Sequence, residues 1–506
     1  MTSPQTSEAA STPAPPSIGT LRQRYGERYR WYLLLSVMVG TMASIMSSTI
    51  VNVAIPGMSH HFSLGQERAQ WVSSGFMVAM TVSMLTTPWL LSRYGYRRTY
   101  VGTMLLLLVG GIVGGLANDF SLVLFARVAE GLAAGVVQPI PAIIILRAFE
   151  PHEQGRASGI FGMGVVLAPA IGPSIGGVLV DLFGWRSIFF MVVPFCLASL
   201  WLAYKFVPKT APGGVAATRG DGLDARGLAL GTVGTLCLLN GLVALRGDSP
   251  LQAALLLTGA LVAFGVFVWW QKRLAASGGT PLMNLALFQY RQFAMGSVVA
   301  FIYGTALFGS TYLLPVYMQV GLHLSASHVG TILLPAGIVL ALTIAGVGRL
   351  ADKHPTWVLV TIGLALLAAS FALMMMLRLD SALWLLVAFA IIGRVGLGFI
   401  LPSLNLGSMR PLAKPLIPQG ASAINFVRML GGAAGVSLCA IVLEWRLAAH
   451  GDSLANPMSS PARLAAFDEV FAMLAGLCAL AICAAWQLRQ GPAEPMKPAG
   501  PPRNTG

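Results

Sequence analysis

Long apolar segments follow one another along most of the chain, and they constrain its fold more than any other feature. Each is about 20 residues long, the length that a helix needs to cross the hydrocarbon core of a bilayer. Backbone polar groups in hydrocarbon must be satisfied within the segment, so each run is expected to be a helix. The composition agrees, because 56% of the 506 residues are hydrophobic and 10% are charged. The sequence therefore predicts an all-α, polytopic membrane protein.

We count fourteen membrane spans. Their expected positions are 31–55, 70–91, 99–117, 121–146, 157–180, 187–206, 227–245, 252–271, 292–319, 328–350, 356–377, 382–408, 420–443 and 467–488. The count divides the chain into a first six-helix half at 31–206, a linker with two extra helices at 207–291 and a second six-helix half at 292–490. Residues 1–30 and 491–506 are rich in Ser, Thr, Pro, Ala or Gly and are expected to be disordered.

The distribution of basic residues predicts the orientation. With both termini placed in the cytoplasm, 23 of the 32 Lys and Arg residues fall in cytoplasmic segments, as the positive-inside rule requires. The same rule explains the net charge of +14, and no long cluster of Lys and Arg suggests nucleic acid as a partner. We expect a multi-pass protein of the cell (inner) membrane, in contact with the lipid bilayer.

Three weak internal repeats relate the two halves. "PWLLSRYGYRR" at Pro88 resembles "GRLADKHPTWV" at Gly348, and "RVAEGLAAGVVQP" at Arg127 resembles "RVGLGFILPSLN" at Arg394. "GRASGIFGM" at Gly155 lines up with "GASAINFVR" at Gly420. Nearly equal offsets indicate a duplicated six-helix unit, an architecture in which transporters hold substrate near the midplane between the halves.

Five motifs in order resemble the major facilitator superfamily, and more narrowly its fourteen-helix drug:proton antiporters, the EmrB/QacA branch. The motifs are "STIVNVAIP" from Ser48, "PWLLSRYGYRR" from Pro88, "RVAEG" from Arg127, "APAIGPSIGG" from Ala168 and "WRSIFFMVVP" from Trp185. The resemblance covers roughly residues 30–490 and implies transport by alternating access.

The fourth motif resembles the antiporter motif of that family. It contains Pro169, Gly172, Pro173, Gly176 and Gly177. Small residues allow close helix packing, and a proline can kink the helix. We expect this face to pack against the other half of the protein; the alternative is ordinary small-residue packing.

The second motif resembles the family's gating loop. Its residues are Ser92, Arg93, Gly95, Arg97 and Arg98, and the second copy supplies Asp352. The resemblance implies an acidic residue at the position of Ser92, so the first copy lacks that charge while Asp352 keeps it. Positive-inside topology also accounts for part of the arginines.

Arg127 and Glu130 are the candidate proton-coupling residues. They are three residues apart on one expected helix, within reach of each other, and charges inside a membrane bundle are functional candidates. The resemblance links this arginine to proton transfer. The branch often has glutamine at the position of Glu130 and an acidic residue at that of Ser47. A static ion pair that fixes packing is an equally good interpretation.

Polar side chains in other spans are candidates for a substrate cavity. They are Asn52, Tyr303, Tyr312, Gln319, Arg394 and Arg428. The alternative for each of these residues is a place in the bundle core or at the lipid.

The resemblance predicts export of hydrophobic drugs or toxic compounds in exchange for protons, with the proton gradient as energy source. No cofactor, no metal site and no enzymatic activity are expected. A phosphate-binding loop and the HExxH motif are absent from the sequence, which argues against an ATP-driven pump and an intramembrane protease. The alternatives are an exporter of a specific metabolite or siderophore and an uptake symporter. Some members of this family act alone, whereas others act with a periplasmic adaptor protein and an outer-membrane channel. The stretch "IFFMVVP" resembles the EmrB side of the branch, and this resemblance implies the adaptor and the channel as partners.

Overall fold

The computed structural model describes residue 23 and residues 25–209, 222–245, 249–379, 381–452 and 461–489. All regular elements in these ranges are helical, as expected. The segments 1–22 and 490–506, which hold most of the expected disordered tails, lie outside them. Residues 25–30 are described, and they belong to the folded part: Tyr25 packs edge-on against Phe206, and Arg30 pairs with Glu153 at 2.7 Å.

The helices follow the expected order. The first half holds α2 (Tyr29–His61), α3 (Gln66–Ser83), α4 (Thr87–Tyr94), α5 (Tyr96–Leu116), α6 (Phe120–Val137), α7 (Ile140–Ala148), α8 (Gln154–Phe183) and α9 (Ser187–Phe206). The inserted pair is α10 (Ala225–Ala244) and α11 (Pro250–Ala276). The second half holds α12 (Arg291–Val316), α13 (Ala326–Leu350), α14 (Thr356–Met374), α15 (Leu383–Met409), α16 (Ile417–Ala449) and α17 (Pro461–Trp486).

Thirteen segments of the described residues are long and apolar enough to cross a membrane. The thirteen do not include α8, a helix of 30 residues that corresponds to the fifth expected span. Two of these spans each contain two α-helices. A short 3-10 turn at Met84–Thr86 separates α3 from α4, and Gln138 and Pro139 separate α6 from α7, where prolines cannot continue the hydrogen-bond ladder.

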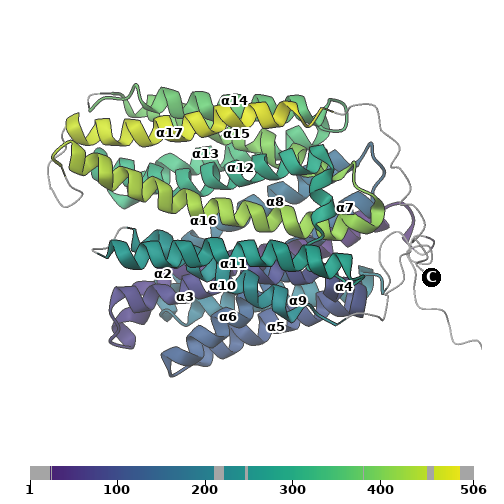
Figure 1. Cartoon of the computed structure of the whole chain (residues 1–506). Coiled ribbons are helices and arrows are strands. Elements are labelled where there is room, and N and C mark those ends of the chain that lie inside the picture. Colours follow the sequence, from purple (N-terminus) through teal and green to yellow (C-terminus); the bar gives the residue numbers. More distant parts are fainter. Residues whose placement is uncertain are drawn as a thin grey trace, which may run out of the picture.

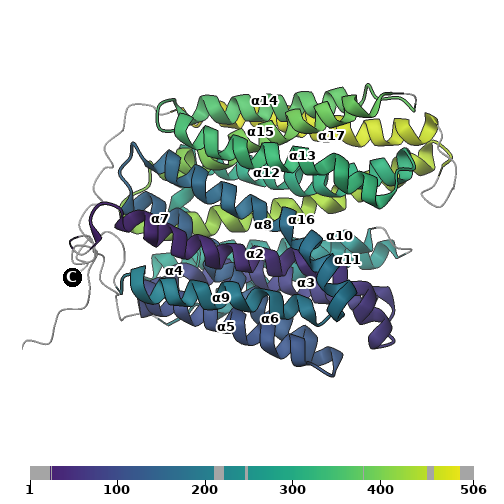
Figure 2. The same cartoon turned by 180° about the vertical axis from the view of Figure 1, so that it is seen from behind.

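The two halves form two layers of roughly parallel helices (Figures 1 and 2). We call the end of the bundle where α2 begins and α17 ends the terminus side, and the opposite end the far side. The layers meet along two seams, one where α8 packs on α13 and one where α16 packs beside α3, α4 and α7. The inserted helix α10 contacts both α3 and α16, so the inserted pair lies against both halves.

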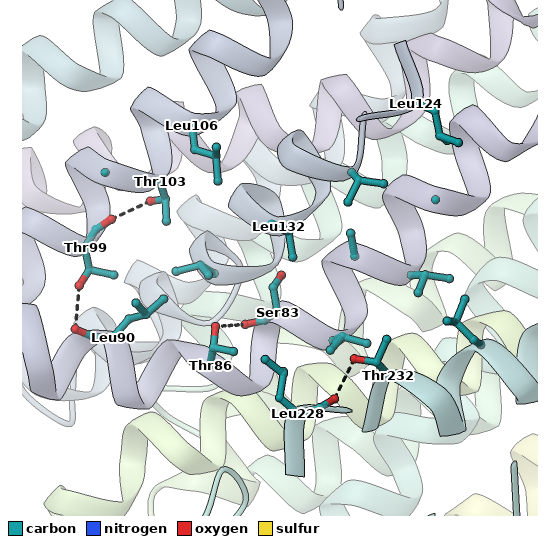
Figure 3. A pocket seen from close by; sticks show the side chains of 18 of the residues that line it. Ser83, Thr86, Leu90, Thr99, Thr103, Leu106, Leu124, Leu132, Leu228 and Thr232 are labelled. Atoms are coloured by element: carbon teal, nitrogen blue, oxygen red, sulfur yellow. Dashed lines mark hydrogen bonds between the residues drawn. The ribbon is translucent and has the colours of Figure 1, made fainter. Parts of the chain in front are cut away.

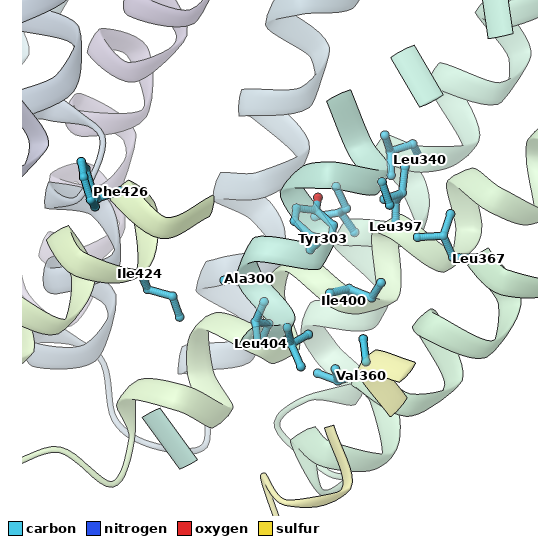
Figure 4. Packing of buried hydrophobic residues seen from close by; sticks show 14 of the residues in the cluster. Ala300, Tyr303, Leu340, Val360, Leu367, Leu397, Ile400, Leu404, Ile424 and Phe426 are labelled. Atoms are coloured by element: carbon cyan, nitrogen blue, oxygen red, sulfur yellow. The ribbon is translucent and has the colours of Figure 1, made fainter. Parts of the chain in front are cut away.

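Each half is held together by close helix packing. In the second half, α12 and α16 approach so closely that a Cβ at Gly304 would overlap the carbonyl oxygen of Arg428. Thr305 donates a hydrogen bond of 2.9 Å to the carbonyl of Gly431 across this contact. Behind it, Leu340, Leu367, Leu397, Ile400 and other apolar side chains fill the interior (Figure 4). Such backbone contact requires glycine at these positions.

Candidate functional site

Arg127 and Glu130 form an ion pair in the middle of α6. Their side chains project from the same face one turn apart, and Arg127 Nη1 lies 2.6 Å from Glu130 Oε2. Only 2% of Arg127 and none of Glu130 is exposed. The expected proximity is therefore present, and the two charges neutralise each other in an apolar interior.

Residues of α2 and α3 complete this polar network. The hydroxyl of Ser47 accepts a hydrogen bond of 2.8 Å from Arg127 and donates one of 3.2 Å to Glu130. Arg127 Nε donates to the carbonyl of Val72 at 3.2 Å, and its guanidinium lies 4.3 Å from the centre of the Phe76 ring. Three helices thus meet at one ion pair.

Two buried atoms of the network have no hydrogen-bond partner among the described residues, namely Glu130 Oε1 and Arg127 Nη2. A carboxylate oxygen with no donor can take a proton without breaking an existing bond. A side chain at Gly110 of α5 would overlap Glu130, with its Cβ 2.7 Å from Cγ. The backbone of α5 therefore closes the site from the other side.

The position of Ser47 was the unexpected part of the site. From the sequence, Ser47 marked only the loss of an expected first-helix carboxylate. The structure places the carboxylate of Glu130 in contact with that position, although the two residues belong to different helices. Spacing along one helix predicted the Arg127–Glu130 contact, whereas a contact between α2 and α6 is a property of the tertiary fold.

Asp352 joins the two halves at the terminus side. It follows α13, and its carboxylate accepts hydrogen bonds from the backbone amides of Gly155 at 2.6 Å and Arg156 at 2.8 Å, in the first turn of α8. A carboxylate at a helix N-terminus is favourable because the amides and the helix dipole face it. Burial raises the pKa of Asp352, and these amides together with Arg410 partly oppose that effect.

Three glycines let α8 and α13 touch beside Asp352. A Cβ at Gly155 would overlap the carbonyl oxygen of Gly348, and one at Gly159 would lie 2.8 Å from the Cα of Gly348. At the other end of these helices, the positions of Gly177 in α8 and Gly330 in α13 have open space around them. The halves are therefore in contact at the terminus side, and this seam is less tightly packed towards the far side.

The described contacts of Ser92 and Arg97 in the first-copy loop are with residues of their own half. Ser92 donates to the carbonyl of Trp89, and the Arg97 guanidinium bonds the carbonyl of Tyr204 and covers its ring. Gly95 has φ of +78°, and a Cβ there would lie 2.6 Å from the carbonyl of Lys209. Arg93 and Arg98 are exposed. Among the expected gating residues, Asp352 is thus the one that bridges the halves.

The antiporter motif packs differently from the expectation. A Cβ at Gly172 would lie 3.2 Å from Thr49, and one at Gly176 would overlap Ile50; both neighbours belong to α2 of the same half. Gly177 faces open space, Pro169 is half-buried, and the side chain of Pro173 lies outside the described part. The contact of α8 with the other half uses Gly155 and Gly159 instead, because that face of α8 points towards α13.

The expected cavity residues are spread over the bundle. Arg428 lines a cavity of about 60 Å³ between the halves, together with Asn425, which accepts its hydrogen bond at 2.5 Å. Tyr303 is buried, and Arg394 and Tyr312 are partly buried, while Asn52 and Gln319 are exposed. Pockets for drug-sized molecules are roughly 300–1,000 Å³, so a substrate can enter this cavity only when the halves move apart.

A second hollow of about 770 Å³ lies on the flank of the first half (Figure 3). It runs along α3 and α4 from Trp71 to Tyr94 and is bordered by α5, α6 and α10. Its walls are almost entirely apolar, with Arg98 at the terminus side. The Arg127–Glu130 pair does not line it.

Comparisons with known proteins agree with this architecture. The sequence pattern of the Major Facilitator Superfamily matches residues 37–436. The "Multidrug resistance protein B homolog" of Mycobacterium tuberculosis (strain ATCC 25618 / H37Rv) is 28% identical over 88% of this chain and 84% of its own length. The "Lincomycin resistance protein LmrB" of Listeria monocytogenes is 25% identical over 81% of this chain and 86% of its own.

The fold is also that of solved transporters. The structure of the proton:xylose symporter XylE superposes with a TM-score of 0.62 and 12% identity, over 91% of this chain and 96% of the symporter. At this identity the likeness concerns the fold alone. The resemblance to drug-resistance transporters is confirmed by the sequence relatives, and the chain is a multi-pass membrane protein with the family and fold of transporters. The protein belongs to the Major Facilitator Superfamily.

Proposed function

We propose that the protein exports hydrophobic small molecules across the cell membrane in exchange for protons, with its terminus side in the cytoplasm. The observation that carries the proposal is the buried network of Ser47, Arg127 and Glu130. Intramembrane ionisable groups are functional candidates because burying them is costly.

Protonation of Glu130 would give the buried Arg127–Glu130 pair a net positive charge. The carboxylate neutralises Arg127 at 2.6 Å; once it is protonated, Arg127 keeps the carbonyl of Val72 and the ring of Phe76 but loses its counter-charge. A proton therefore biases the packing of α6 against α2 and α3, which is what a two-state transporter requires of its coupling ion.

The network also has a physical connection to the other half. Phe76, which lies under Arg127, packs in an apolar cluster with Met80 and Met84, and Met429 of α16 joins that cluster. Movement of Arg127 can therefore be transmitted to α16 through contacting side chains. Asp352 and the glycines around it supply a contact at the terminus side that must separate when the protein opens to the cytoplasm.

The names of the relatives support drug export as the type of transport. Two of them are a multidrug and a lincomycin resistance protein. An exporter of one metabolite or siderophore would use the same network. An uptake symporter would use the same network for the proton, but its substrate would move in the same direction as the proton.

Reconstituted protein in proteoliposomes, with an imposed pH gradient and a panel of hydrophobic dyes of different charge, tests the proposal. We expect dye to move against the proton flux in the unmodified protein. Glu130→Gln should bind dye but transport it only downhill, and Glu130→Asp should retain part of the coupling. Uphill transport by Glu130→Gln with an unchanged pH profile would show that Glu130 is a static partner of Arg127.

A further inference from the structure

The arginine motif occurs once in each half, and the two copies differ in charge at one position. Arg127 in "RVAEG" corresponds to Arg394 in "RVGLG", and Glu130 corresponds to Leu397. In the first half the carboxylate three residues on neutralises the arginine. In the second half the same place holds a leucine that is 1% exposed.

Arg394 consequently has no acidic partner among the residues that the structure describes. Arg428, the other guanidinium in the middle of the second half, bonds only the amide oxygen of Asn425. The phenol of Tyr303 is the titratable group that lies near both arginines, and it is uncharged at neutral pH. Two positive charges thus share one region of the second half without a counter-charge in the described chain.

Arg428 lines the cavity between the halves, and Arg394 lies on α15, a helix that also contributes to its wall. Each lies near the middle of its helix and is partly exposed. On α15, Arg394 precedes Leu401 and Asn405 of that cavity by about two and about three helical turns, spacings that place the three residues on one face of the helix. An unpaired charge at this depth is costly, and an anion in the cavity would offset that cost.

The rest of the cavity wall is mainly apolar. Ile145, Phe161, Val165 and Ile344 belong to it, and Gln138 and Asn425 add amide groups. A ligand that suits this wall has an apolar body and one anionic group. Guanidinium groups bind carboxylate, sulfonate or phosphate oxygens through several N–H donors at once.

We propose that Arg394 and Arg428 bind the anionic group of an amphipathic organic anion, and that such anions are the preferred substrates. The inference rests on the proposed function, because it assigns the substrate class of the cavity through which export would occur. Glu130 of the first half exchanges the proton, and the two arginines of the second half bind the substrate.

Two probes with the same rings test this inference. 8-Anilino-1-naphthalenesulfonate carries a sulfonate, and N-phenyl-1-naphthylamine lacks it. Their binding to protein in lipid nanodiscs is measured by fluorescence, with protein-free nanodiscs subtracted. We expect the sulfonate to bind at least about tenfold more tightly, which corresponds to about one charge-assisted hydrogen bond.

Variants at Leu397 provide a matched control. Leu397→Glu supplies the carboxylate that the first half has, and it should weaken sulfonate binding by about tenfold or more while leaving the neutral probe unaffected. Leu397→Gln has the same shape without the charge and should keep the preference for the sulfonate. Arg394→Gln and Arg428→Gln should lower sulfonate affinity, and Arg273→Gln on the inserted helix α11 should not.

Equal affinity for the two probes, or equal effects of Leu397→Glu and Leu397→Gln, would overturn the inference. Binding is measured without a pH gradient, so this result is independent of proton coupling. If the sulfonate preference is present and Glu130→Gln still transports uphill, the anion site stands and the proposed proton site falls.

Discussion

The two halves carry the same arginine motif in different electrostatic settings. In the first half, Arg127 is neutralised by Glu130 and enclosed by Ser47 and Phe76. In the second half, Arg394 has Leu397 where the carboxylate would be, and it is partly exposed. The residue three positions after the arginine is an acid in the first half and a leucine in the second, and Arg394 has no acidic partner among the described residues.

This difference suggests how one fold separates two tasks. A buried ion pair with no net charge can take up and release a proton, and the packing of the helices around the pair changes when it does. A free cation beside a cavity is suited to a ligand that enters and leaves. The apolar cluster contains Phe76, which contacts Arg127, and Met429, which follows Arg428 in α16, so packing contacts would connect the two sites.

The largest expected difference is between two single variants in which the same substitution is made at equivalent arginines of the two halves. Arg127→Met leaves Glu130 buried without its partner and should destabilise the protein by about 3–5 kcal/mol. Arg394→Met removes a charge that has no counter-charge and should be neutral or stabilising. Thermal unfolding in detergent, followed by size-exclusion chromatography, compares the two.

The double variant Arg127→Met/Glu130→Gln is the control for that comparison. It removes both charges and should regain much of the stability that Arg127→Met loses. Equal destabilisation by Arg127→Met and Arg394→Met would mean that the two arginines have equivalent surroundings.

A second prediction compares the two ends of α8. Gly159→Ala places a Cβ against the backbone of Gly348 and should weaken the terminus-side contact by about 1–3 kcal/mol. Gly177→Ala meets open space and should change little. Distances between spin labels on α8 and α13 measure the closed fraction, and an unaltered distribution in Gly159→Ala would rule out this contact as the gate.

Ser47 gives a smaller effect within the first-half network. Ser47→Ala removes hydrogen bonds to both Arg127 and Glu130 and should cost about 1–2 kcal/mol, because the bonds involve charged groups. Ser48→Ala loses only a bond to the carbonyl of Ile45 in its own helix. Unfolding temperatures of the two variants should differ, with Ser47→Ala the lower; the reverse order would remove Ser47 from the network.

The smallest effect is a pH dependence of the terminus-side contact. Burial raises the pKa of Asp352 in the closed arrangement, whereas an exposed carboxyl has its ordinary value. The closed form therefore binds a proton more tightly, and closure should strengthen as the pH falls from above the raised pKa towards the ordinary one. Asp352→Asn should remove this dependence in the same spin-label experiment, and a pH response that survives the substitution must come from another group.

The sequence predicted much of the fold because the signals were local. Apolar runs of membrane-spanning length marked the helices, and the repeated motifs marked the two halves. Arg127 and Glu130 could be placed together because three residues along a helix make one turn. The boundaries shifted where tertiary contacts extend a helix, as at Tyr29, whose hydroxyl donates to the carbonyl of Phe206.

The parts that could not be predicted depend on contacts between helices. The glycines of the antiporter motif were expected to face the other half, yet Gly172 and Gly176 pack on α2. A helix with small residues on several faces does not reveal which face meets which neighbour. The contact of Ser47 with Glu130 and of Asp352 with Gly155 likewise joins residues that are far apart in the sequence.

The affinity for 8-anilino-1-naphthalenesulfonate, measured on three proteins in identical nanodiscs, tests the division of labour between the halves most directly. The three are the unmodified protein, Glu130→Gln and Leu397→Glu. If the first half handles the proton and the second half the anion, Glu130→Gln will keep the affinity within about twofold, and Leu397→Glu will lower it by about tenfold or more. Equal loss in both variants, or no loss in either, would contradict the account.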